Sequence, residues 1–487
     1  MSNIRVRYPP SPTGEPHLGN IRTALFNWLF AKNNKGKFIL RVEDTDRNRL
    51  VEGAMESQLE ALKWLGIDWD EGPDIGGEYK PYTQSERLDI YKKISYRLIQ
   101  DGFAYKCYCS QERLTQMREG YKKNQSIVGY DRKCRNINLL ELGEINNEKS
   151  YVVRFKTPLE GKIIFNDLIR GQVEFENIRL DDFVILKSDG FPTYHLANVV
   201  DDYHMKITHV MRAEEWLSST PKHIHIYNSM NWEMPKFAHL PIILAPDKSK
   251  LSKRHGATSI LEYRRLGYLP NAMVNFLAKL GWSLDGETEK IETPELINNF
   301  SLKKVSKSGA IFDIDKLNWL NGVYIRELTA DELTFELLAY WKIFPSLELP
   351  ANIDYDLLKR IVPLISERIK TLNDTAPLIS YFFSDTVKYK KEQILQKGLN
   401  FSDVNIILEK LYSEVIAIDN FESHVIETNL RNFVLESNYK TGQVLGILRV
   451  IYTGLDVAPP LFESMEILGK GHCVSVISRA IDNMKSS

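Results

Sequence analysis

The chain has 487 residues, of which 43% are hydrophobic, and its 63 Lys and Arg side chains nearly balance its 64 Asp and Glu side chains. This length predicts roughly three domains with packed cores and excludes a disordered chain or a single small module. The balanced charge gives no sign of a nucleic-acid partner, so any RNA-binding surface must be a local patch. No apolar run is long enough for a membrane span, the N-terminus lacks an apolar leader, and four cysteines are too few for a disulfide framework. We therefore expect a cytoplasmic protein that does not bind membranes.

The first forty residues predict a strand, a stiff loop, a helix and a second strand. Residues 4–8 alternate apolar and arginine side chains, and residues 9–12 contain three prolines, which end the strand. We expect Pro16 at the first helical position and Gly36 at the end of the helix. A strand over 38–42 completes a strand–helix–strand unit, which is typical of α/β folds.

The start of this helix is a potential anion site, because its first backbone N–H groups have no partner in the helix. His17 and Asn20 offer polar side chains there, and Gly19 leaves room for a flat base. Alternatively, His17 only caps the helix or packs against it. The chain lacks Gly-x-x-x-x-Gly-Lys and Gly-x-Gly-x-x-Gly, which excludes the two commonest phosphate loops.

Glu43 follows the second strand at its carboxyl end, where open α/β sheets bind ligands. Helices are expected over 55–66 and 88–102, the second with a capping box at 83–86. From 103 to 192 the pattern changes to short strands, which indicates an insertion between two halves of a nucleotide-binding fold. The three clearest strands are 151–155, 173–175 and 183–186.

Two further patterns follow. Residues 247–256 carry five Lys or Arg side chains; this is either a solvated loop or a mobile loop that closes over phosphates. Beyond about residue 330, apolar side chains recur at helical spacing and predict an all-helical region without catalytic residues. The stripes are Leu333, Leu337, Leu338, Trp341; Val404, Ile407, Leu408, Leu411, Val415; Val444, Leu445, Leu448, Ile451; and Val474, Ile477, Ile481, Met484.

The motif at the helix start and the motif in the basic loop together resemble the signatures of class I aminoacyl-tRNA synthetases. Residues 17–20 read His-Leu-Gly-Asn where the family has His-Ile-Gly-His, and residues 250–254 read Lys-Leu-Ser-Lys-Arg where it has Lys-Met-Ser-Lys-Ser. With the Pro-Ser-Pro-Thr-Gly run at 10–14, the chain is similar to the bacterial-type glutamyl-tRNA synthetases. The resemblance covers nearly the whole chain and weakens across 107–150 and beyond about 330.

The resemblance implies an α/β fold: a Rossmann-type nucleotide-binding fold with an α+β insertion, followed by an all-α C-terminal anticodon-binding region. The implied domains are the first half of the catalytic fold at 1–102, the acceptor-end-binding insertion at 103–192, the second half of the catalytic fold at 193–240, a stem-contact region with the basic loop at 241–330, and the helical anticodon-binding region at 331–487.

The implied activity is the ATP-dependent ligation of L-glutamate to tRNA(Glu) through a glutamyl-adenylate, with release of AMP and diphosphate and with Mg²⁺ as cofactor. The implied catalytic residues are His17, Asn20, Lys250 and Lys253. ATP binding is implied for Pro10, His17, Gly19, Asn20, Lys250, Ser252, Lys253 and Arg254. Glutamate binding is implied for Arg7, Pro9, Ser11, Glu43, Tyr194, Asn198, Arg212 and Trp216. Arg7 and Arg212 suit the side-chain carboxylate, and Glu43 suits the α-ammonium group.

Some members of the family bind zinc through three cysteines and a histidine in the insertion. Cys107, Cys109 and Cys134 match the cysteines, but Asn136 stands where we expect the histidine. We therefore expect metal-free thiols and no metal site, because an amide is a poor zinc ligand.

For tRNA recognition, the resemblance implies that Arg368 and Arg449 contact the anticodon, with Arg368 reading its third base. The alternative for Arg368 is an exposed arginine paired with a nearby acid. We expect a monomer. The rival functions are a non-discriminating enzyme that also attaches glutamate to tRNA(Gln), a small-molecule nucleotidyltransferase and a non-catalytic RNA-binding relative; the last would be expected to have lost one of the two ATP motifs.

Overall fold

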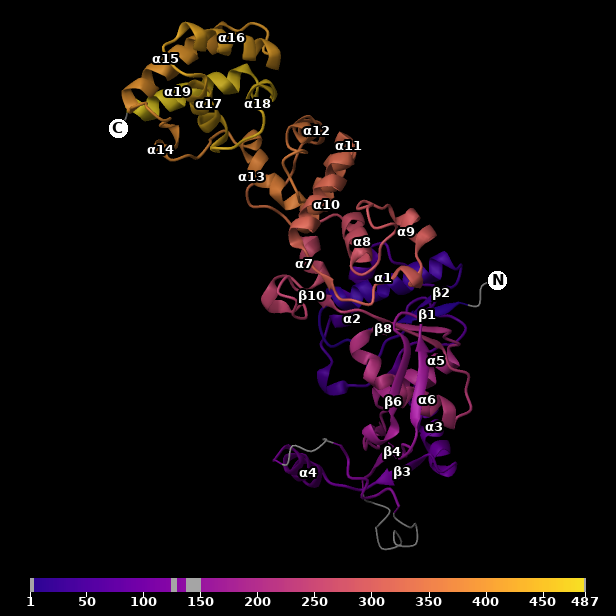
Figure 1. Ribbon diagram of the computed structural model, residues 1–487. Helices are drawn as coiled ribbons and strands as arrows, with labels where there is room; N and C mark the ends of the chain where they lie inside the picture. Colours follow the sequence, from indigo (N-terminus) through magenta and orange to yellow (C-terminus); the bar gives the residue numbers. More distant parts are fainter. Residues whose placement is uncertain (1–3, 124–128, 137–149, 486–487) are drawn as a thin grey trace. The chain divides into compact units, whose positions relative to one another are not determined.

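The computed structural model describes residues 4–123, 129–136 and 150–485 (Figure 1). These residues form two compact units, which we describe separately. The first comprises Met1–Tyr263 and Pro270–Ile314, and the second comprises Arg264–Leu269 and Asp315–Ser487. The first unit contains the described strands, and the second is helical. None of the described helices combines the length and apolarity needed to cross a bilayer.

The first unit is built on a parallel α/β arrangement. Strands β1 (Arg5–Tyr8) and β2 (Lys37–Leu40) are parallel, and helix α1 (Leu18–Asn33) connects them and packs against both. Beside them lies a four-stranded sheet in the order β6-β5-β9-β8, in which β8 and β9 are parallel and β5 and β6 are antiparallel. Thr208 lies just before β8, and its N–H donates to the Arg5 carbonyl of β1 while the Arg5 N–H donates to the Thr208 hydroxyl, so the two sheets adjoin. The expected Rossmann-type α/β fold is confirmed.

The remaining strands of this unit are β3 (Ala104–Cys107), β4 (Val152–Phe155), β5 (Lys162–Asp167), β6 (Gly171–Glu176), β7 (Val184–Leu186), β8 (His209–Ala213), β9 (Lys236–Leu240), β10 (Ile243–Leu244) and β11 (Ala310–Ile311). Its helices are α2 (Ala54–Trp64), α3 (Leu88–Gln100), α4 (Gln111–Lys123), α5 (Tyr194–His204), α6 (Thr220–Ser229), α8 (Pro270–Lys279) and α9 (Thr293–Asn299). Helix α7 (Ile260–Arg265) runs from the first unit into the second.

One hydrophobic core joins the predicted insertion to the nucleotide-binding fold. Phe155 of β4 and Phe165 of β5 belong to the same buried cluster as Leu196 of α5 and Val210 of β8. Strand β5 also pairs with β9. The functional boundaries that we expect at 102, 192, 240 and 330 remain predictions, since compactness does not show which segment contacts which part of a tRNA.

The second unit is all helical, as expected for the C-terminal region. Its helices are α10 (Ile314–Glu327), α11 (Ala330–Ile343), α12 (Tyr355–Ile361), α13 (Thr375–Ile379), α14 (Lys391–Ile394), α15 (Phe401–Ala417), α16 (Ser423–Glu436), α17 (Thr441–Thr453), α18 (Leu461–Leu468) and α19 (Lys470–Lys485). The predicted stripe on α15, from Val404 to Val415, is fully buried and packs with the stripes of α17 and α19 in one core. Apolar spacing therefore predicted the packing faces correctly.

Two details near the predicted site differ from the expectations. Helix α1 begins at Leu18 with His17 as its N-cap, so Pro16 lies before the helix rather than at its first position. Thr83 makes no capping bond, because extended pairing with Val42 holds its backbone and the Ser85 N–H donates to Asp44 Oδ1 at 2.8 Å instead. A 3-10 turn, Gln84–Arg87, therefore precedes α3.

The turn after α1 explains why glycine is required there. The helix ends at Asn33, Lys35 adopts a positive φ of 50°, and a Cβ on Gly36 would lie 2.5 Å from the carbonyl oxygen of Ile4. Only glycine fits at this approach. The turn thereby sets the register in which Arg7 of β1 faces Ile39 of β2.

Candidate functional site

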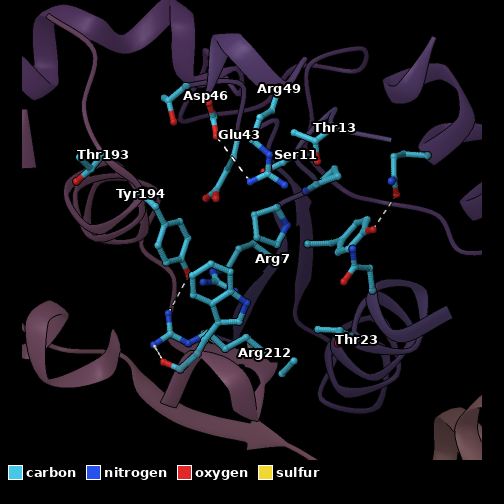
Figure 2. Close-up of a pocket in the computed structure, with 18 of the residues that line it drawn as sticks. Arg7, Ser11, Thr13, Thr23, Glu43, Asp46, Arg49, Thr193, Tyr194 and Arg212 are labelled. Carbon is cyan, nitrogen blue, oxygen red and sulfur yellow. Dashed lines mark hydrogen bonds and ion pairs between the residues drawn. The ribbon is translucent and has the colours of Figure 1, made fainter. Parts of the chain in front are cut away.

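A cavity of about 540 Å³ opens where β1 and β8 end, which is the position expected for ligands in an α/β sheet (Figure 2). Seven of the eight residues predicted to bind glutamate line it: Arg7, Pro9, Ser11, Glu43, Tyr194, Arg212 and Trp216. The eighth, Asn198 on α5, is buried and donates to Glu43 Oε1 at 3.3 Å. Pro10, predicted for ATP, also lines this cavity. Seven side chains from distant segments thus meet in one place.

Arg7 is buried in the wall of the cavity, and only two of its three guanidinium nitrogens are hydrogen-bonded. Its Nε and Nη2 donate to the two carboxylate oxygens of Asp202 at 3.0 and 3.2 Å. Its Nη1 is buried and has no hydrogen-bond partner. A buried unpaired donor is costly, so its position beside a cavity indicates a ligand acceptor. Asp202 also accepts from Arg41 at 2.7 Å, and these two arginines hold the pKa of Asp202 below its usual value despite burial.

Glu43 supplies a buried negative charge to the cavity, which the exposed Asp46 also lines. Arg41 Nη2, Asn198 Nδ2 and Gln84 Nε2 all donate to its Oε1, at 2.9, 3.3 and 3.4 Å. Within the described residues no hydrogen bond ends on Oε2, which leaves that oxygen for a ligand donor. Burial raises the pKa of Glu43, although Arg41 and Arg7 oppose the effect. The side chain is nevertheless matched to a cation such as an ammonium group.

Arg212, at the end of β8, forms another wall of the cavity. Its Nη1 donates to the Tyr194 hydroxyl at 3.0 Å and its Nη2 to the Trp216 carbonyl at 3.3 Å (Figure 2). The rings of Tyr194 and Trp216 pack with centroids 4.4 Å apart. Both aromatic residues line the cavity and shield Arg212, which is only 5% exposed. The arrangement offers a buried cation to a carboxylate.

A second cavity, of about 240 Å³, brings the two sequence motifs together. It is lined by His17, Gly19 and Asn20 from the first motif and by Lys250 from the second. Asn20 lines both cavities, so the two are adjacent. Positive charge and a helix N-terminus in one cavity suit phosphate.

The N-cap residue, His17, already uses one of the backbone N–H groups at the start of α1. His17 Nδ1 accepts the Gly19 N–H at 3.2 Å, so the capping alternative is correct as far as it goes. Asn20 N–H and Ile21 N–H both donate to the His17 carbonyl. Capping fixes the imidazole at the mouth of the second cavity, where it also lines the wall.

Backbone hydrogen bonds fasten the two motifs to each other. Leu18 N–H donates to the Thr258 carbonyl at 2.9 Å, and Ile260 N–H donates to the Pro16 carbonyl at 3.1 Å. Within the second motif, Leu251 N–H donates to the Ile243 carbonyl. Residues 252–257 of the chain are therefore held at both ends.

The side chains of the basic loop are only partly engaged with the second cavity. Lys250 forms an ion pair with Glu215, which also lines that cavity. The Ser252 hydroxyl bonds to His255 Nδ1 at 3.0 Å, and Arg254 is exposed. The side chain of Lys253 lies outside the described residues. Among the described side chains of the second motif, Lys250 and its neighbour Leu251 line the cavity.

Sequence reasoning missed the residues that support the site. Asp202 and Arg41 hold Arg7 and Glu43 in place but belong to no motif. Lys187, which lines the first cavity and donates to the Thr45 carbonyl at 2.8 Å, was also missed. The adjacent acids at 201 and 202 inside an apolar helix were the available signal, because buried acids require cationic partners.

The three cysteines predicted to be metal-free thiols form a tight cluster. The sulfur atoms of Cys107, Cys109 and Cys134 lie within 4.8 Å of one another. The Tyr130 hydroxyl lies 3.3 Å from Cys107 Sγ and 3.4 Å from Cys109 Sγ, whereas Asn136 is exposed. Among the described residues, the Tyr130 hydroxyl contacts two of the three sulfur atoms and is the candidate fourth donor, although a tyrosine is an unusual zinc ligand.

The two residues predicted to contact the anticodon both lie in the second unit. Arg368 is exposed in a turn before α13, and the described residues give it no ion-pair partner, contrary to the alternative of a paired surface arginine. Arg449 lies half-buried on α17. Their roles remain predictions.

Comparison with known proteins agrees with this geometry. Residues 3–319 match the model of the tRNA synthetases class I (E and Q), catalytic domain, and residues 332–481 match an anticodon binding domain. A glutamate–tRNA ligase of Dehalococcoides mccartyi is 51% identical over 99% of this chain and 98% of its own length. A glutamate–tRNA ligase 2 of Caldicellulosiruptor saccharolyticus is 46% identical over 98% of this chain and 99% of its own length.

Among solved structures, a glutamate tRNA ligase from Elizabethkingia meningosepticum in complex with its amino acid has a TM-score of 0.87 and 34% identity, covering 99% of this chain and all of its own. The match extends through both units, and the residues matched by the catalytic-domain model, 3–319, span both signature motifs. The chain therefore belongs to the class I tRNA synthetases of the glutamate and glutamine (E and Q) family.

Proposed function

We propose that the chain uses ATP to join L-glutamate to tRNA(Glu) through a glutamyl-adenylate, releasing AMP and diphosphate. The observation that carries the proposal is the charge layout of the larger cavity. It places a carboxylate, Glu43, and two buried guanidinium groups, Arg7 and Arg212, around one opening. An acidic amino acid such as glutamate has an ammonium group and a side-chain carboxylate that complement both charges.

In the first step, an oxygen of the glutamate α-carboxylate attacks the α-phosphorus of ATP, and the bond from that phosphorus to the diphosphate breaks. The protein contributes positioning and charge. His17 and Asn20 would contact the triphosphate at the helix start, and Lys250 would exchange Glu215 for phosphate oxygens. Lys253, Ser252 and Arg254 stay predicted ATP ligands. In the second step, a terminal ribose hydroxyl of the tRNA attacks the mixed anhydride and AMP leaves.

Mg²⁺ would neutralise the triphosphate. Outside the three-cysteine cluster, no group of His, Cys, Asp or Glu side chains in the described part of the chain has the geometry to hold a metal. We therefore infer that ATP phosphates and water supply most of its ligands, which is the usual habit of this ion.

Metal-free thiols remain our prediction for the three-cysteine cluster. Burial and the neighbouring thiols raise the pKa of Tyr130, so its hydroxyl stays protonated and is a weak zinc ligand. We expect elemental analysis of the purified chain to give far less than one zinc ion per molecule. One zinc ion per chain, lost on Tyr130→Phe, would contradict this expectation.

A small-molecule nucleotidyltransferase is not favoured, because it has no use for the anticodon binding domain at 332–481. The test is incubation with ATP, labelled amino acid and bulk tRNA, followed by measurement of acid-precipitable label. We expect label from glutamate and almost none from glutamine. Equal labelling from both amino acids, or none from glutamate, would refute the proposal. We also propose a cytoplasmic monomer, which sedimentation at micromolar concentration would check.

A further inference from the structure

All five N–H donors of Arg212 end on uncharged groups. Nε donates to His239, Nη1 to the Tyr194 hydroxyl and to His223, and Nη2 to the Thr220 hydroxyl and to the Trp216 carbonyl, at 3.2, 3.0, 3.2, 2.8 and 3.3 Å. In the described part of the chain no carboxylate forms an ion pair with this guanidinium group. Arg212 is thus saturated with hydrogen bonds and still carries its full positive charge.

Three other buried arginines of this unit, in contrast, form ion pairs with carboxylates. Arg7 is paired through two bonds with Asp202, and Arg41 with Asp202 and Glu43. Arg87 is paired with Asp201 at 2.7 Å. Arg22 and Arg154 are also buried and form no ion pair among the described residues, but neither lines the larger cavity. A buried cation without a counter-ion is expensive, so its presence in the wall of that cavity needs a reason.

The hydrogen bonds around Arg212 fix which histidine nitrogens carry protons. Asp167 Oδ2 accepts a hydrogen bond from the His239 Nδ1–H at 2.6 Å, so the His239 Nε2 lone pair faces Arg212. On the other side, His223 Nδ1 accepts from Arg212, so its Nε2 proton points to His195 Nδ1 at 3.2 Å. We name Asp167, His195, His223 and His239 the histidine frame.

The three histidines of the frame stay uncharged at neutral pH. Burial and the charge of Arg212 hold the pKa of His223 well below its usual range. Burial, Lys222 and Arg212 lower the pKa of His195 to about 3. Burial also lowers the pKa of His239, although Asp167 opposes this. The single carboxylate, Asp167, is separated from Arg212 by an imidazole ring.

The two sides of the guanidinium group also differ. His223, His239 and Thr220 lie behind it, whereas Tyr194 and Trp216 line the cavity. The two bonds on the cavity side go to a hydroxyl and a carbonyl, which a ligand carboxylate can replace with stronger charge-assisted bonds. The bonds on the far side hold the fork in place during the exchange.

We propose that the histidine frame determines amino-acid specificity: its neutral acceptors orient Arg212 and withhold a counter-ion, so that the side-chain carboxylate of glutamate completes the charge balance and the neutral amide of glutamine does not. The inference rests on the proposed function and adds positioning residues to it. None of the four residues of the frame lines the cavity. They act through Arg212.

His223→Asp and His223→Asn test the proposal as a matched pair, because the two side chains have the same size and differ in charge. Asn keeps an uncharged oxygen that can accept from Arg212 Nη1, and Asp supplies the counter-ion that the frame withholds. The measurements are the KM for glutamate in aminoacylation, the inhibition constant of glutamine and the melting temperature of each variant.

We expect His223→Asn to raise the KM for glutamate less than about fivefold. We expect His223→Asp to raise it about 10²-fold, because the new carboxylate pairs with Arg212 inside the protein and replaces the glutamate carboxylate. The inhibition constant of glutamine should change less than about threefold in both, since an amide gains little from an uncompensated charge. Equal effects of the two variants on glutamate, or a parallel loss for glutamine, would overturn the proposal.

If His223→Asp does not fold, Thr220→Val and Thr220→Ser examine the far side of the same fork. Thr220→Val removes the hydroxyl that fixes Nη2, so we expect it to raise the KM for glutamate about tenfold. Thr220→Ser keeps the hydroxyl, so we expect an increase of less than about threefold. Equal values would overturn the positioning role. A wild-type enzyme that fails to attach glutamate at all would refute the proposed function itself, which separates the two outcomes.

Discussion

Replacing Glu43 with glutamine should separate substrate binding from folding stability. Glutamine has the same size and keeps an oxygen that can accept from Arg41 and Asn198, which lie 2.9 and 3.3 Å from Oε1. Because burial raises the pKa of Glu43, the ionised carboxylate lowers the stability of the folded protein at neutral pH. We therefore expect Glu43→Gln to change the free energy of unfolding by less than about 1 kcal/mol, or to increase it.

The effect on binding should be large. The variant exchanges a charge-assisted bond to the substrate ammonium for a neutral amide that presents an N–H donor, which costs about 2–3 kcal/mol. At 1.36 kcal/mol per tenfold, this raises the KM for glutamate about 30- to 150-fold. In the wild type the KM should also rise as pH falls, because Glu43 protonates at a higher pH than an ordinary glutamate and only the carboxylate binds the ammonium. The variant should lose this pH dependence.

The assay is aminoacylation at saturating ATP and tRNA with glutamate varied between pH 5 and 8, about the range in which a raised carboxyl pKa acts, together with denaturant unfolding of the same samples. Glu56→Gln, on an exposed position of α2, is the control for removal of an acid. If Glu43→Gln loses more than about 2 kcal/mol of stability while its KM is unchanged, Glu43 serves chiefly as a partner of Arg41 and does not bind the ammonium.

Three further predictions concern other parts of the chain. Lys253→Ala should slow adenylate formation about 10²-fold or more with little change in tRNA affinity, whereas Lys248→Ala in the same loop should not; a normal rate of pyrophosphate exchange in Lys253→Ala would remove this loop from the chemistry. Arg368→Gln should relax discrimination between tRNA(Glu) and tRNA(Gln) by about 1–3 kcal/mol in kcat/KM; a wild type that charges both equally, or a variant that keeps full selectivity, would show that Arg368 does not read the anticodon. Glu71→Gln should lower the free energy of unfolding by about 3–5 kcal/mol, because it breaks a buried carboxylate pair with Arg5 at 2.8 Å. Despite burial, the bonds from Arg5, Tyr82 and Lys37 lower the pKa of Glu71 from 4.5 to about 2. The stability that ionised Glu71 contributes should therefore be complete above pH 4.5 and vanish as pH falls toward 2. Acid unfolding of the wild type and of Glu71→Gln would show this.

The parts of the site that lie at strand ends or in motifs could be predicted from the sequence. Glu43 was predicted at the ligand site because it follows a strand, whereas Arg7 was assigned to that site through the resemblance to the synthetase family. Their buried partner Asp202 was not, because it lies 195 residues from Arg7, and two adjacent acids in an apolar helix do not indicate which cation they pair with. Long-range ion pairs depend on which helix packs against which strand, and that depends on the whole core.

The histidine frame illustrates the same limit. His223 lies in the middle of α6 and His239 in β9, both among apolar residues, where a histidine is commonly a core residue. A histidine inside an apolar run was the only local sign. Local rules also failed where tertiary pairing competed with them: the Thr83 sequence fits a capping box, yet pairing with Val42 holds its backbone extended.

The anchoring of the basic loop constrains how the enzyme can close over ATP. With Leu251 and Thr258 both hydrogen-bonded to the body of the unit, residues 252–257 form a tether too short for a large swing. Ordering so short a tether costs little conformational entropy, so closure should draw only slightly on the binding energy of ATP. Lengthening this tether with flexible residues should therefore raise the KM for ATP while leaving glutamate and tRNA affinities unaltered.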